Sequence, residues 1–308
     1  MPLIIPNSLP AAEALQNENI FTMDRGRAVT QDIRPLKIVI VNLMPTKIAT
    51  ETQLARVLSN SPLQVEMTLV TMDSHESTHI SQEHMDSFYK TIDEIKDDYF
   101  DGMILTGAPV EQMPYEQVDY WSELCEIFEF AKTHVYSSMF ICWGAQASLY
   151  YHYGIDKHLL DKKVFGIFEH KVVRPHNPLV RGFDEVFFAP HSRHTEVLRE
   201  DIEKHLELRI LADSPEVGPH IISVENGRQI FVLGHQEYDK GTLANEYFRD
   251  VKKGLDIEVP KNYFRNDDPE DEILFRWRSH ASLLFSNWLN YYVYQDTPYD
   301  LGELKENR

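Results

Sequence analysis

The chain has 308 residues, which is enough for one large domain or two small ones. Hydrophobic residues make up 43% of it and charged residues 26%, as in an ordinary globular protein with an ample core. The 49 acidic side chains outnumber the 30 basic ones, and the net charge of −19 argues against binding to nucleic acid or anionic membranes. An anionic substrate would need a local basic pocket or a helix N-terminus.

Two cysteines, Cys125 and Cys142, are too few for a disulfide framework or a Cys-rich zinc site. The first seven residues are apolar, but this stretch is too short for a signal peptide and is broken by proline. We therefore expect a cytoplasmic protein.

Residues 1–35 show no clear periodicity and indicate an N-terminal extension, laid as an extended arm on the domain or on a partner subunit. We assign residues 36–298 to a single catalytic α/β domain, with a polar excursion at about 256–272, and residues 299–308 to a C-terminal tail. A homodimer is one expectation for the oligomeric state.

The first half of the domain alternates between buried strands and helices. Strands are expected at 37–42, 65–70, 102–106 and 135–143, and helices at 48–58, around 88–95 and at 117–132. This alternation, without hairpin signals, predicts a mostly parallel sheet with helices on both faces. Functional residues gather at the carboxyl ends of the strands in such sheets.

The second half has shorter predicted strands, and two further helices are expected there. The strands are placed at 163–167, 185–188, 207–212 and 230–233, and the helices at 243–253 and about 273–292. The closing helix is rich in aromatic residues and is expected to pack on the core or at a subunit interface. The acidic run 266–272 is interpreted as a solvated loop.

Cys142 lies where an α/β protein exposes a nucleophile. The apolar run 135–143 ends at this residue, and Gly144 begins a stretch typical of a helix N-terminus. The partial positive charge of that terminus lowers the pKa of a thiol. We therefore predict a nucleophilic Cys142, whereas Cys125, in the apolar stripe of a helix, is expected to be structural.

The base and its partner come from the sequence His-x-Glu after the strand at 230–233. His235 and Glu237 are two positions apart in an extended segment, so their side chains share a face. Glu237 can then orient the imidazole of His235, which accepts the proton of the cysteine. The backbone N–H of Trp143 is expected to stabilise an oxyanion, and Gly107 or Ala108 to supply the second donor.

Other histidines are weaker candidates. His75, His79 and His84 lack a clear third ligand, so no metal site is predicted. His191 and His194 fall in a predicted loop, where contact with substrate and a simple turn role are equally expected.

Three segments resemble the class I glutamine amidotransferase superfamily: Thr106-Gly107-Ala108-Pro109, 140–146 and 234–237. The resemblance implies a flavodoxin-like sheet with a cysteine elbow and a His-x-Glu pair. Phe140 stands where that superfamily has the first glycine of its elbow, and no synthetase domain is attached to receive ammonia. These departures count against a plain glutaminase.

A closer resemblance covers nearly the whole chain. Segments 42–47, 140–146, 189–194 and 276–280 look like those of the homoserine O-acyltransferases of methionine biosynthesis. The resemblance implies Cys142 as the acyl-thioester nucleophile, His235 as proton acceptor and Glu237 as its partner. It also implies L-homoserine and acetyl-coenzyme A as substrates, ping-pong kinetics and no further cofactor.

The same resemblance implies, by position, that Lys163, Ser192 and Arg249 bind substrate. Without the family, Lys163 and Arg249 would be interpreted as surface charges. Glu111 stands at a position that the family associates with the choice of acyl donor, glutamate with acetyl and glycine with succinyl. A second carboxylate ~4 Å away would be repelled by about 4 kcal/mol at an effective dielectric near 20. We therefore predict an acetyltransferase.

Three alternatives remain open at this point. The donor could be succinyl-coenzyme A, giving a homoserine O-succinyltransferase. Water could replace homoserine in a glutaminase-like cysteine hydrolase of the same superfamily. The third alternative is a catalytically silent binding protein, against which the intact Cys142, His235 and Glu237 argue.

Overall fold

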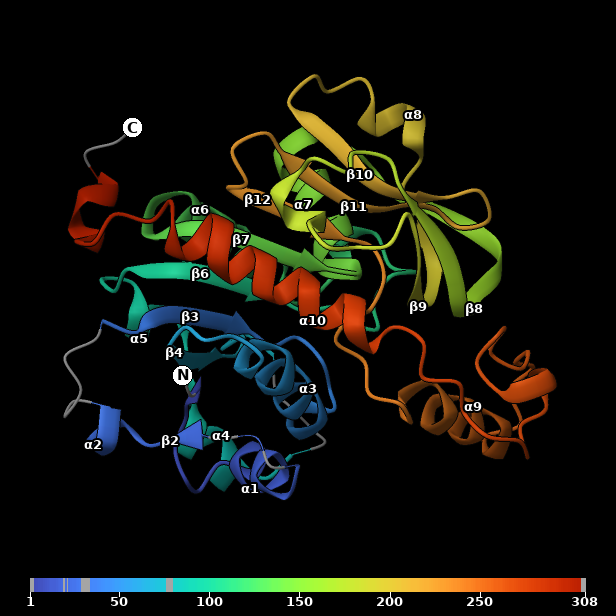
Figure 1. Ribbon diagram of the computed structural model, residues 1–308, viewed down its shortest axis with the longest axis horizontal. Coiled ribbons are helices and arrows are strands. Elements are labelled where there is room, and N and C mark those ends of the chain that lie inside the picture. The colour runs from blue at the N-terminus through green and yellow to red at the C-terminus, as the bar shows by residue number, and fades with distance from the viewer. Residues whose placement is uncertain (1–2, 19, 21, 29–33, 76–79, 306–308) are drawn as a thin grey trace.

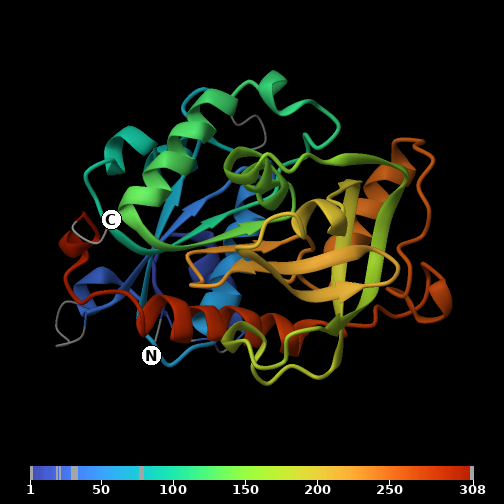
Figure 2. The same cartoon turned by 90° about the horizontal axis from the view of Figure 1, so that it is seen from above.

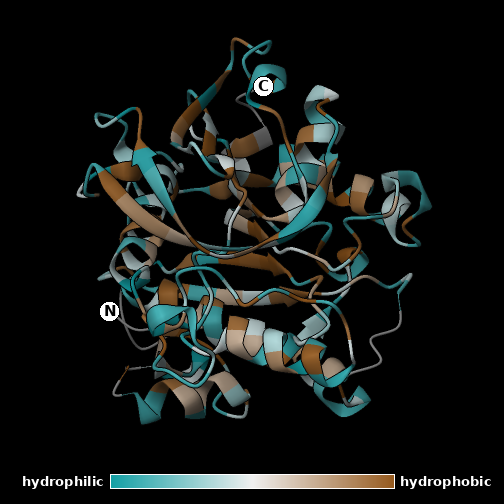
Figure 3. Ribbon diagram, turned by 90° about the vertical axis from the view of Figure 1, so that its right-hand side faces the viewer, coloured by the Kyte–Doolittle hydropathy of each residue, from teal (hydrophilic) through white to brown (hydrophobic). Residues whose placement is uncertain are grey.

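One large sheet organises the molecule. The computed structural model describes residues 3–18, 20, 22–28, 34–75 and 80–305. Within that part, twelve strands form one sheet in the order β2-β1-β4-β3-β6-β7-β12-β11-β10-β8-β9, and β5 pairs with β4 off this path. Helices pack around the sheet, and apolar residues concentrate along its central strands (Figures 1 and 3). None of the described helices is long and apolar enough to cross a membrane.

The first half of the sheet is parallel, as predicted. Its four main strands are, in sheet order, β4 (Val65–Val70), β3 (Leu36–Val41), β6 (Phe100–Leu105) and β7 (Val135–Ile141). They are rich in apolar and β-branched residues because both faces of a parallel sheet are covered. Asn42, Thr106 and Cys142 directly follow three of these strands, so they lie at the same edge.

Helices cover both faces of this half (Figure 2). One face carries α1 (Pro10–Asn17), α3 (Lys47–Ser59) and α10 (Arg278–Asn287), and the other carries α6 (Trp121–His134) and α7 (Trp143–Tyr153). Each face has its own hydrophobic cluster, with Leu54 and Trp288 in one and Phe128 and Phe140 in the other. These clusters hold the strand ends, and therefore the loops that follow them, in fixed positions.

The second half of the sheet is mainly antiparallel, so the sheet as a whole is mixed. Its strands are β8 (His158–Val172), β9 (Val186–Glu196), β10 (Leu208–Ser214), β11 (Gly218–Val224) and β12 (Gln229–Val232). Only β12 pairs in parallel, with β7, within this described half. Strands β8 and β9 are much longer than predicted, and they include residues 190–195, which were expected to form a loop.

The turn between β11 and β12 carries a hairpin signal in the sequence. Asn226 and Gly227 lie between β11 and β12, and Gly227 has a φ of 67°, as in a tight hairpin turn. Strand β11 was not predicted at all.

The N-terminal segment is more than the extended arm that was expected, because it contributes two strands to the sheet and a helix to one face. Strand β1 (Leu3–Ile4) pairs with β4 and with β2 (Thr22–Met23), and α1 packs on α3. The region expected as one helix near 88–95 is divided into α4 (Gln82–Phe88), β5 (Tyr89–Lys90) and α5 (Ile92–Ile95). Tyr89 pairs with Leu69 of β4, and this ladder contact interrupts the helix.

The predicted polar excursion contains a small core of its own. Tyr263 and Phe264 are buried with Trp277 against α9 (Thr242–Lys252), while residues 266–268 and 270–272 of the acidic run are exposed as expected. Helix α10 begins at residue 278 rather than 273 and continues into a π-helix, η4 (Trp288–Tyr294). The remaining short helices are α2 (Arg25–Ala28), η1 (Tyr115–Gln117), η2 (Pro178–Val180), α8 (Arg199–Ile202), η3 (Arg265–Asp267) and η5 (Leu301–Lys305).

Candidate active site

Cys142 occupies a strained turn between β7 and α7. Its φ of 52° and ψ of −116° are values that residues with a side chain rarely adopt. Such strain clusters at functional sites, where the surrounding structure holds it in place. The side chain is 5% exposed and lines a cavity. Helix α7 begins at Trp143, and its first amides have no acceptor within the helix. An anion formed at Cys142 would therefore meet unpaired N–H donors.

Two glycines allow the backbone to close around this turn. A Cβ on Gly144 would lie 2.5 Å from the carbonyl oxygen of Thr106, so α7 can approach the end of β6 only with glycine here. A Cβ on Gly107 would lie 3.3 Å from Cβ of Cys142 and 3.5 Å from Cε1 of His235. Gly107 therefore packs against both the predicted nucleophile and the predicted base. Gly107 and Ala108 both line the cavity, as expected of the oxyanion donors, and that role remains a prediction.

His235 lies just beyond β12, which pairs with the strand that carries Cys142. Its backbone N–H donates to the carbonyl of Pro190 at 2.8 Å, and its ring stacks on Tyr238 with centroids 4.0 Å apart. Nδ1 and the Oε1 atom of Glu237 are 2.7 Å apart. The side chains of His235 and Glu237 therefore meet as predicted, although residues 236–237 form a turn and not the expected extended segment. Cys142 is close enough to the ring to raise the pKa of His235.

The charges around His235 favour its protonated form. Burial by itself lowers the pKa of His235, but the negative charges of Cys142 and Glu237 and the hydrogen bonds to both outweigh it. The net effect raises the pKa well above the ordinary value. A base with a raised pKa holds the proton taken from a nucleophile and can return it to a leaving group.

The predicted site residues converge on one cavity of about 530 Å³, a size typical of small-molecule sites. Eight of them line it: Gly107, Ala108, Glu111, Cys142, Lys163, Ser192, His235 and Arg249. Trp143 and Glu237 are not among the lining residues, since Trp143 is buried in α7 and Glu237 supports the ring of His235. Residues from both halves of the sheet thus meet at one place.

Glu246 connects the three predicted substrate-binding residues, and the sequence analysis missed it. Its Oε1 atom is 2.5 Å from Nζ of Lys163, accepts from Oγ of Ser192 at 2.8 Å, and is 4.0 Å from Nη2 of Arg249. Arg249 also pairs with Asp250 at 2.7 Å. The spacing Glu246-x-x-Arg249 puts both on one face of a helix. Together these residues form a cluster of both charge signs, which suits a zwitterionic amino acid.

Glu111 lies at the border of the cavity, after the loop that follows β6. Its Oε1 atom accepts from the backbone N–H of His194 at 3.1 Å. His194 and Ser192 alternate along β9 with the buried His191 and Arg193, so the first pair faces the cavity and the second faces inward. The loop predicted for this segment is thus a strand, and that strand holds Glu111 in place.

Comparison with known proteins assigns the family. The sequence profile described as homoserine O-succinyltransferase matches residues 2–299. The chain belongs to this family. A protein named homoserine O-acetyltransferase from Clostridium novyi (strain NT) is 61% identical over 300 residues, which are 97% of this chain and 99% of the relative. One of the same name from Acetivibrio thermocellus is 60% identical over 305 residues, with 99% and 100% covered. The predicted resemblance to homoserine O-acyltransferases is confirmed.

Solved structures support the predicted fold. A glutamine amidotransferase from Thermotoga maritima matches with a TM-score of 0.54 and 11% sequence identity, over 83% of this chain and 98% of that one. One from Methylobacillus flagellatus matches with a TM-score of 0.52 and 11% identity, over 84% and 95%. At this identity the likeness concerns the fold alone, and it confirms the class I glutamine amidotransferase-like fold.

Behind the site, this member of the homoserine O-succinyltransferase family buries a cation. Arg193 is 2% exposed, and its guanidinium donates to the carbonyls of Thr195 at 2.5 Å and Val217 at 2.6 Å. Burial lowers its pKa, while the negative charges of Cys142, Glu196 and Glu111 oppose that shift. Arg193 therefore adds positive potential on the side of Cys142 that faces the core.

Three buried histidines gather behind Gly234, and the sequence analysis did not connect them. The ring nitrogens of His170, His191 and His220 lie within 4.8 Å of one another, close enough to share a metal ion. His170 and His191 approach at 3.0 Å. Burial lowers the pKa of His170 to about 3 and also lowers the pKa of the other two. The positive charge of Arg193 contributes to all three shifts, so it disfavours a cation here.

The histidines considered first have other surroundings. Nδ1 of His75 is 2.7 Å from Oδ2 of Asp119, and Nε2 of His84 is 3.0 Å from Oε1 of Glu51. His79 lies outside the described residues. Cys125 is half-buried in α6, and burial together with nearby glutamates raises its pKa, as suits a structural thiol.

Proposed function

We propose that this protein is a homoserine O-acetyltransferase that moves an acetyl group from acetyl-coenzyme A to the hydroxyl of L-homoserine. The observation that carries the proposal is the single cavity in which Cys142 and His235 meet the charged cluster of Lys163, Glu246 and Arg249. Family membership and the names of the relatives support it. The products are O-acetyl-L-homoserine and coenzyme A, and the enzyme acts in methionine biosynthesis in the cytoplasm.

In the first half-reaction, Sγ of Cys142 attacks the carbonyl carbon of the thioester after its proton passes to His235. The oxyanion is stabilised by the amide of Trp143 and by Gly107 or Ala108. The bond between that carbon and the sulfur of coenzyme A then breaks. The departing thiolate takes the proton from His235, and an acetyl group stays on Cys142. One thioester replaces another, so the step is close to balanced in free energy.

In the second half-reaction, the hydroxyl of homoserine takes the place of the departed thiol. His235 accepts the hydroxyl proton while the oxygen attacks the acetyl carbon. The bond to Sγ of Cys142 breaks, and the ester is released. The sulfur then recovers the proton from His235, which Glu237 has held in the productive orientation.

Homoserine is placed by the charged cluster. Lys163 and the planar fork of Arg249 are suited to its carboxylate, and Glu246 to its ammonium group. In the structure Lys163 and Ser192 are paired with Glu246, so the amino acid must insert itself into this set of contacts. A buried ammonium left without a partner would be costly, and this selects for an α-amino acid.

The choice of acetyl over succinyl rests on Glu111 and on the relatives' names. The family profile carries the succinyl name, whereas the two relatives above carry the acetyl name. Glu111 borders the cavity beside the loop of Gly107 and Ala108. Its carboxylate occupies space and repels the terminal carboxylate of a succinyl group.

The test is the intact mass of the protein after incubation with acetyl- or succinyl-coenzyme A, followed by addition of homoserine. We expect one acetyl group on wild-type protein, its loss when homoserine is added, and release of coenzyme A before homoserine is present. Formation of O-acetyl-L-homoserine completes the test. A glutaminase-like hydrolase would instead turn over without coenzyme A, and that result would defeat the proposal.

A further inference from the structure

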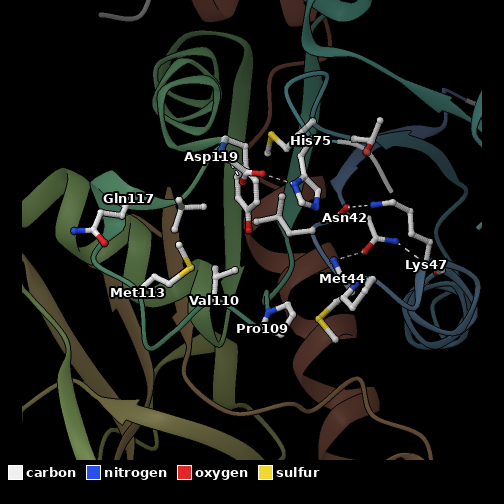
Figure 4. Close-up of a pocket in the computed structure, with 15 residues that line it drawn as sticks. Asn42, Met44, Lys47, His75, Pro109, Val110, Met113, Gln117 and Asp119 are labelled. Atoms are coloured by element: carbon white, nitrogen blue, oxygen red, sulfur yellow. Dashed lines mark hydrogen bonds and ion pairs between the residues drawn. The ribbon is translucent and has the colours of Figure 1, made fainter. Parts of the chain in front are cut away.

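A second cavity lies beside the active site and has no role in the chemistry above. Its volume is about 460 Å³. Its walls come from the loop after β3, the end of β4 and the long loop between β6 and α6 (Figure 4). Most of the lining is apolar: Leu43, Met44, Pro45, Met72, Pro109, Val110, Met113, Val118 and Tyr120. Polar groups are Asn42, Lys47, Thr71, His75, Gln117 and Asp119.

The two cavities share a wall. Met44, Pro45, Pro109, Val110 and Met113 line both of them. Pro109 and Val110 directly follow Gly107 and Ala108, the expected oxyanion donors. The second cavity therefore begins directly next to the loop of those donors.

The reaction requires two separate routes away from Cys142. The sulfur that leaves in the first half-reaction and the hydroxyl that enters in the second must both stand beside His235, because it handles both protons. The substrates can share that point but must diverge beyond it. The charged cluster of Lys163, Glu246 and Arg249 suits the acceptor, and it lies on β8 and α9. The second cavity is formed by loops of the parallel half instead.

We propose that the second cavity binds the pantetheine arm of acyl-coenzyme A. This inference rests on the proposed function and adds the place of the donor. The arm is slender and largely apolar with two amides, which matches apolar walls that carry a few polar groups. Gln117 lines the cavity and is exposed, so its side chain is free to turn and pair its amide with an amide of the arm. The side-chain amide of Asn42 donates a hydrogen bond to the hydroxyl of Tyr89 at 2.8 Å. Asn42 therefore forms part of the cavity wall and is not available to the arm.

The test narrows the cavity without touching the residues that line the catalytic one. Thr71→Phe fills its inner part, and Gln117→Trp narrows it from an exposed position that tolerates substitution. Thr68→Phe is the matched control, since Thr68 lies on the same strand, β4, but lines a different cavity near Ile4 and Leu9. Steady-state kinetics would be measured with acetyl-coenzyme A and with S-acetyl-N-acetylcysteamine, a short thioester that lacks most of the arm.

For both cavity variants we expect the KM for acetyl-coenzyme A to rise about tenfold or more, as loss of a few apolar contacts predicts. The KM for the short donor and the KM for homoserine should be unchanged. These unchanged values would also show that the fold and Cys142 are intact. An unchanged KM for acetyl-coenzyme A in both variants, or a rise in the KM for homoserine instead, overturns the inference. If wild-type protein takes an acetyl group from neither donor, it is the proposed function that fails.

Discussion

The parallel and antiparallel halves of the sheet contribute different parts of the site. The parallel half supplies Cys142, the amide of Trp143 and the glycine loop, all at strand ends. The antiparallel half and α9 supply Lys163, Ser192 and the helix that carries Glu246 and Arg249. His235 belongs to the junction, because β12 pairs with β7 in parallel and with β11 antiparallel.

This difference teaches which parts of the enzyme are general and which are particular. A thiol on a strained turn with backbone donors can attack thioesters or amides of many kinds. A cluster of side chains with both charge signs selects one kind of acceptor. If this division is correct, changes in the parallel half should affect acetylation of the enzyme, and changes in the antiparallel half should affect use of homoserine.

The largest effect is expected for Cys142→Ala. Acyl transfer should fall by more than the ~10²–10⁴-fold typical of a lost acid–base group, because no thioester can form. Intact mass should show no acetyl group, while thermal unfolding should show a folded protein. Cys125→Ser is the matched control and should keep full activity. Substantial turnover by Cys142→Ala would show that Cys142 is not the nucleophile and that the parallel half does not supply it.

His235→Asn tests the junction between the halves. Both half-reactions should slow by about 10²–10⁴-fold, since each needs a proton acceptor. Glu237→Gln should lose less activity, because the imidazole of His235 remains but is less well oriented. Single-turnover rates of acetylation and deacetylation would be measured separately. A loss confined to one of the two steps would contradict a shared base.

Lys163→Met should affect the acceptor alone. A hydrogen bond to a charged group contributes about 1.5–3 kcal/mol, so the KM for homoserine should rise about 10- to 100-fold. Acetylation by acetyl-coenzyme A should keep its wild-type rate. The neighbouring Lys162, whose side chain is 77% exposed, provides the control Lys162→Met, which should change neither. Slower acetylation in Lys163→Met would contradict the assignment of acetylation to the parallel half and of homoserine binding to the antiparallel half.

Glu111→Gly should widen the choice of donor. This substitution removes both the charge and the bulk of Glu111, so the rate with succinyl-coenzyme A should rise about tenfold. The gain is not larger because Glu111 is partly exposed and solvent screens its charge. Glu111→Gln, which keeps the size but not the charge, separates the two causes. Competition assays with both donors provide the measurement. Equal use of both donors by the wild type would show that Glu111 does not discriminate.

The smallest effect is on stability and depends on pH. The pKa of His235 is raised in the folded state, so its contribution is fully present below its unfolded pKa of about 6.5 and is lost as pH rises through the folded value. Glu237→Gln removes part of that shift. Urea unfolding should therefore give wild type the larger free energy of unfolding near pH 6, and the difference from Glu237→Gln should shrink at alkaline pH as His235 loses its proton. The same difference at both pH values would contradict the charged pair.

The parallel half was well predicted because its signals are local. Residues 38–41 of β3 form a continuous apolar run, and the helix after Cys142 begins at a small-residue turn. The antiparallel half was poorly predicted because long strands with mixed polarity, such as β8, have no distinct period. The Asn226–Gly227 turn was the one short-range signal available for the β11–β12 hairpin, and it was overlooked.

The sequence by itself determined the family, and it predicted the nucleophile and the His-x-Glu pair, since each depends on residues that are close together or on motifs in a fixed order. Tertiary structure alone decided that Glu246 joins Lys163 and Ser192, and that three histidines from separate strands meet behind Gly234. It also decided that a second cavity opens beside Cys142. Such contacts depend on how strands and helices distant in the chain pack, and packing leaves no local pattern in the sequence.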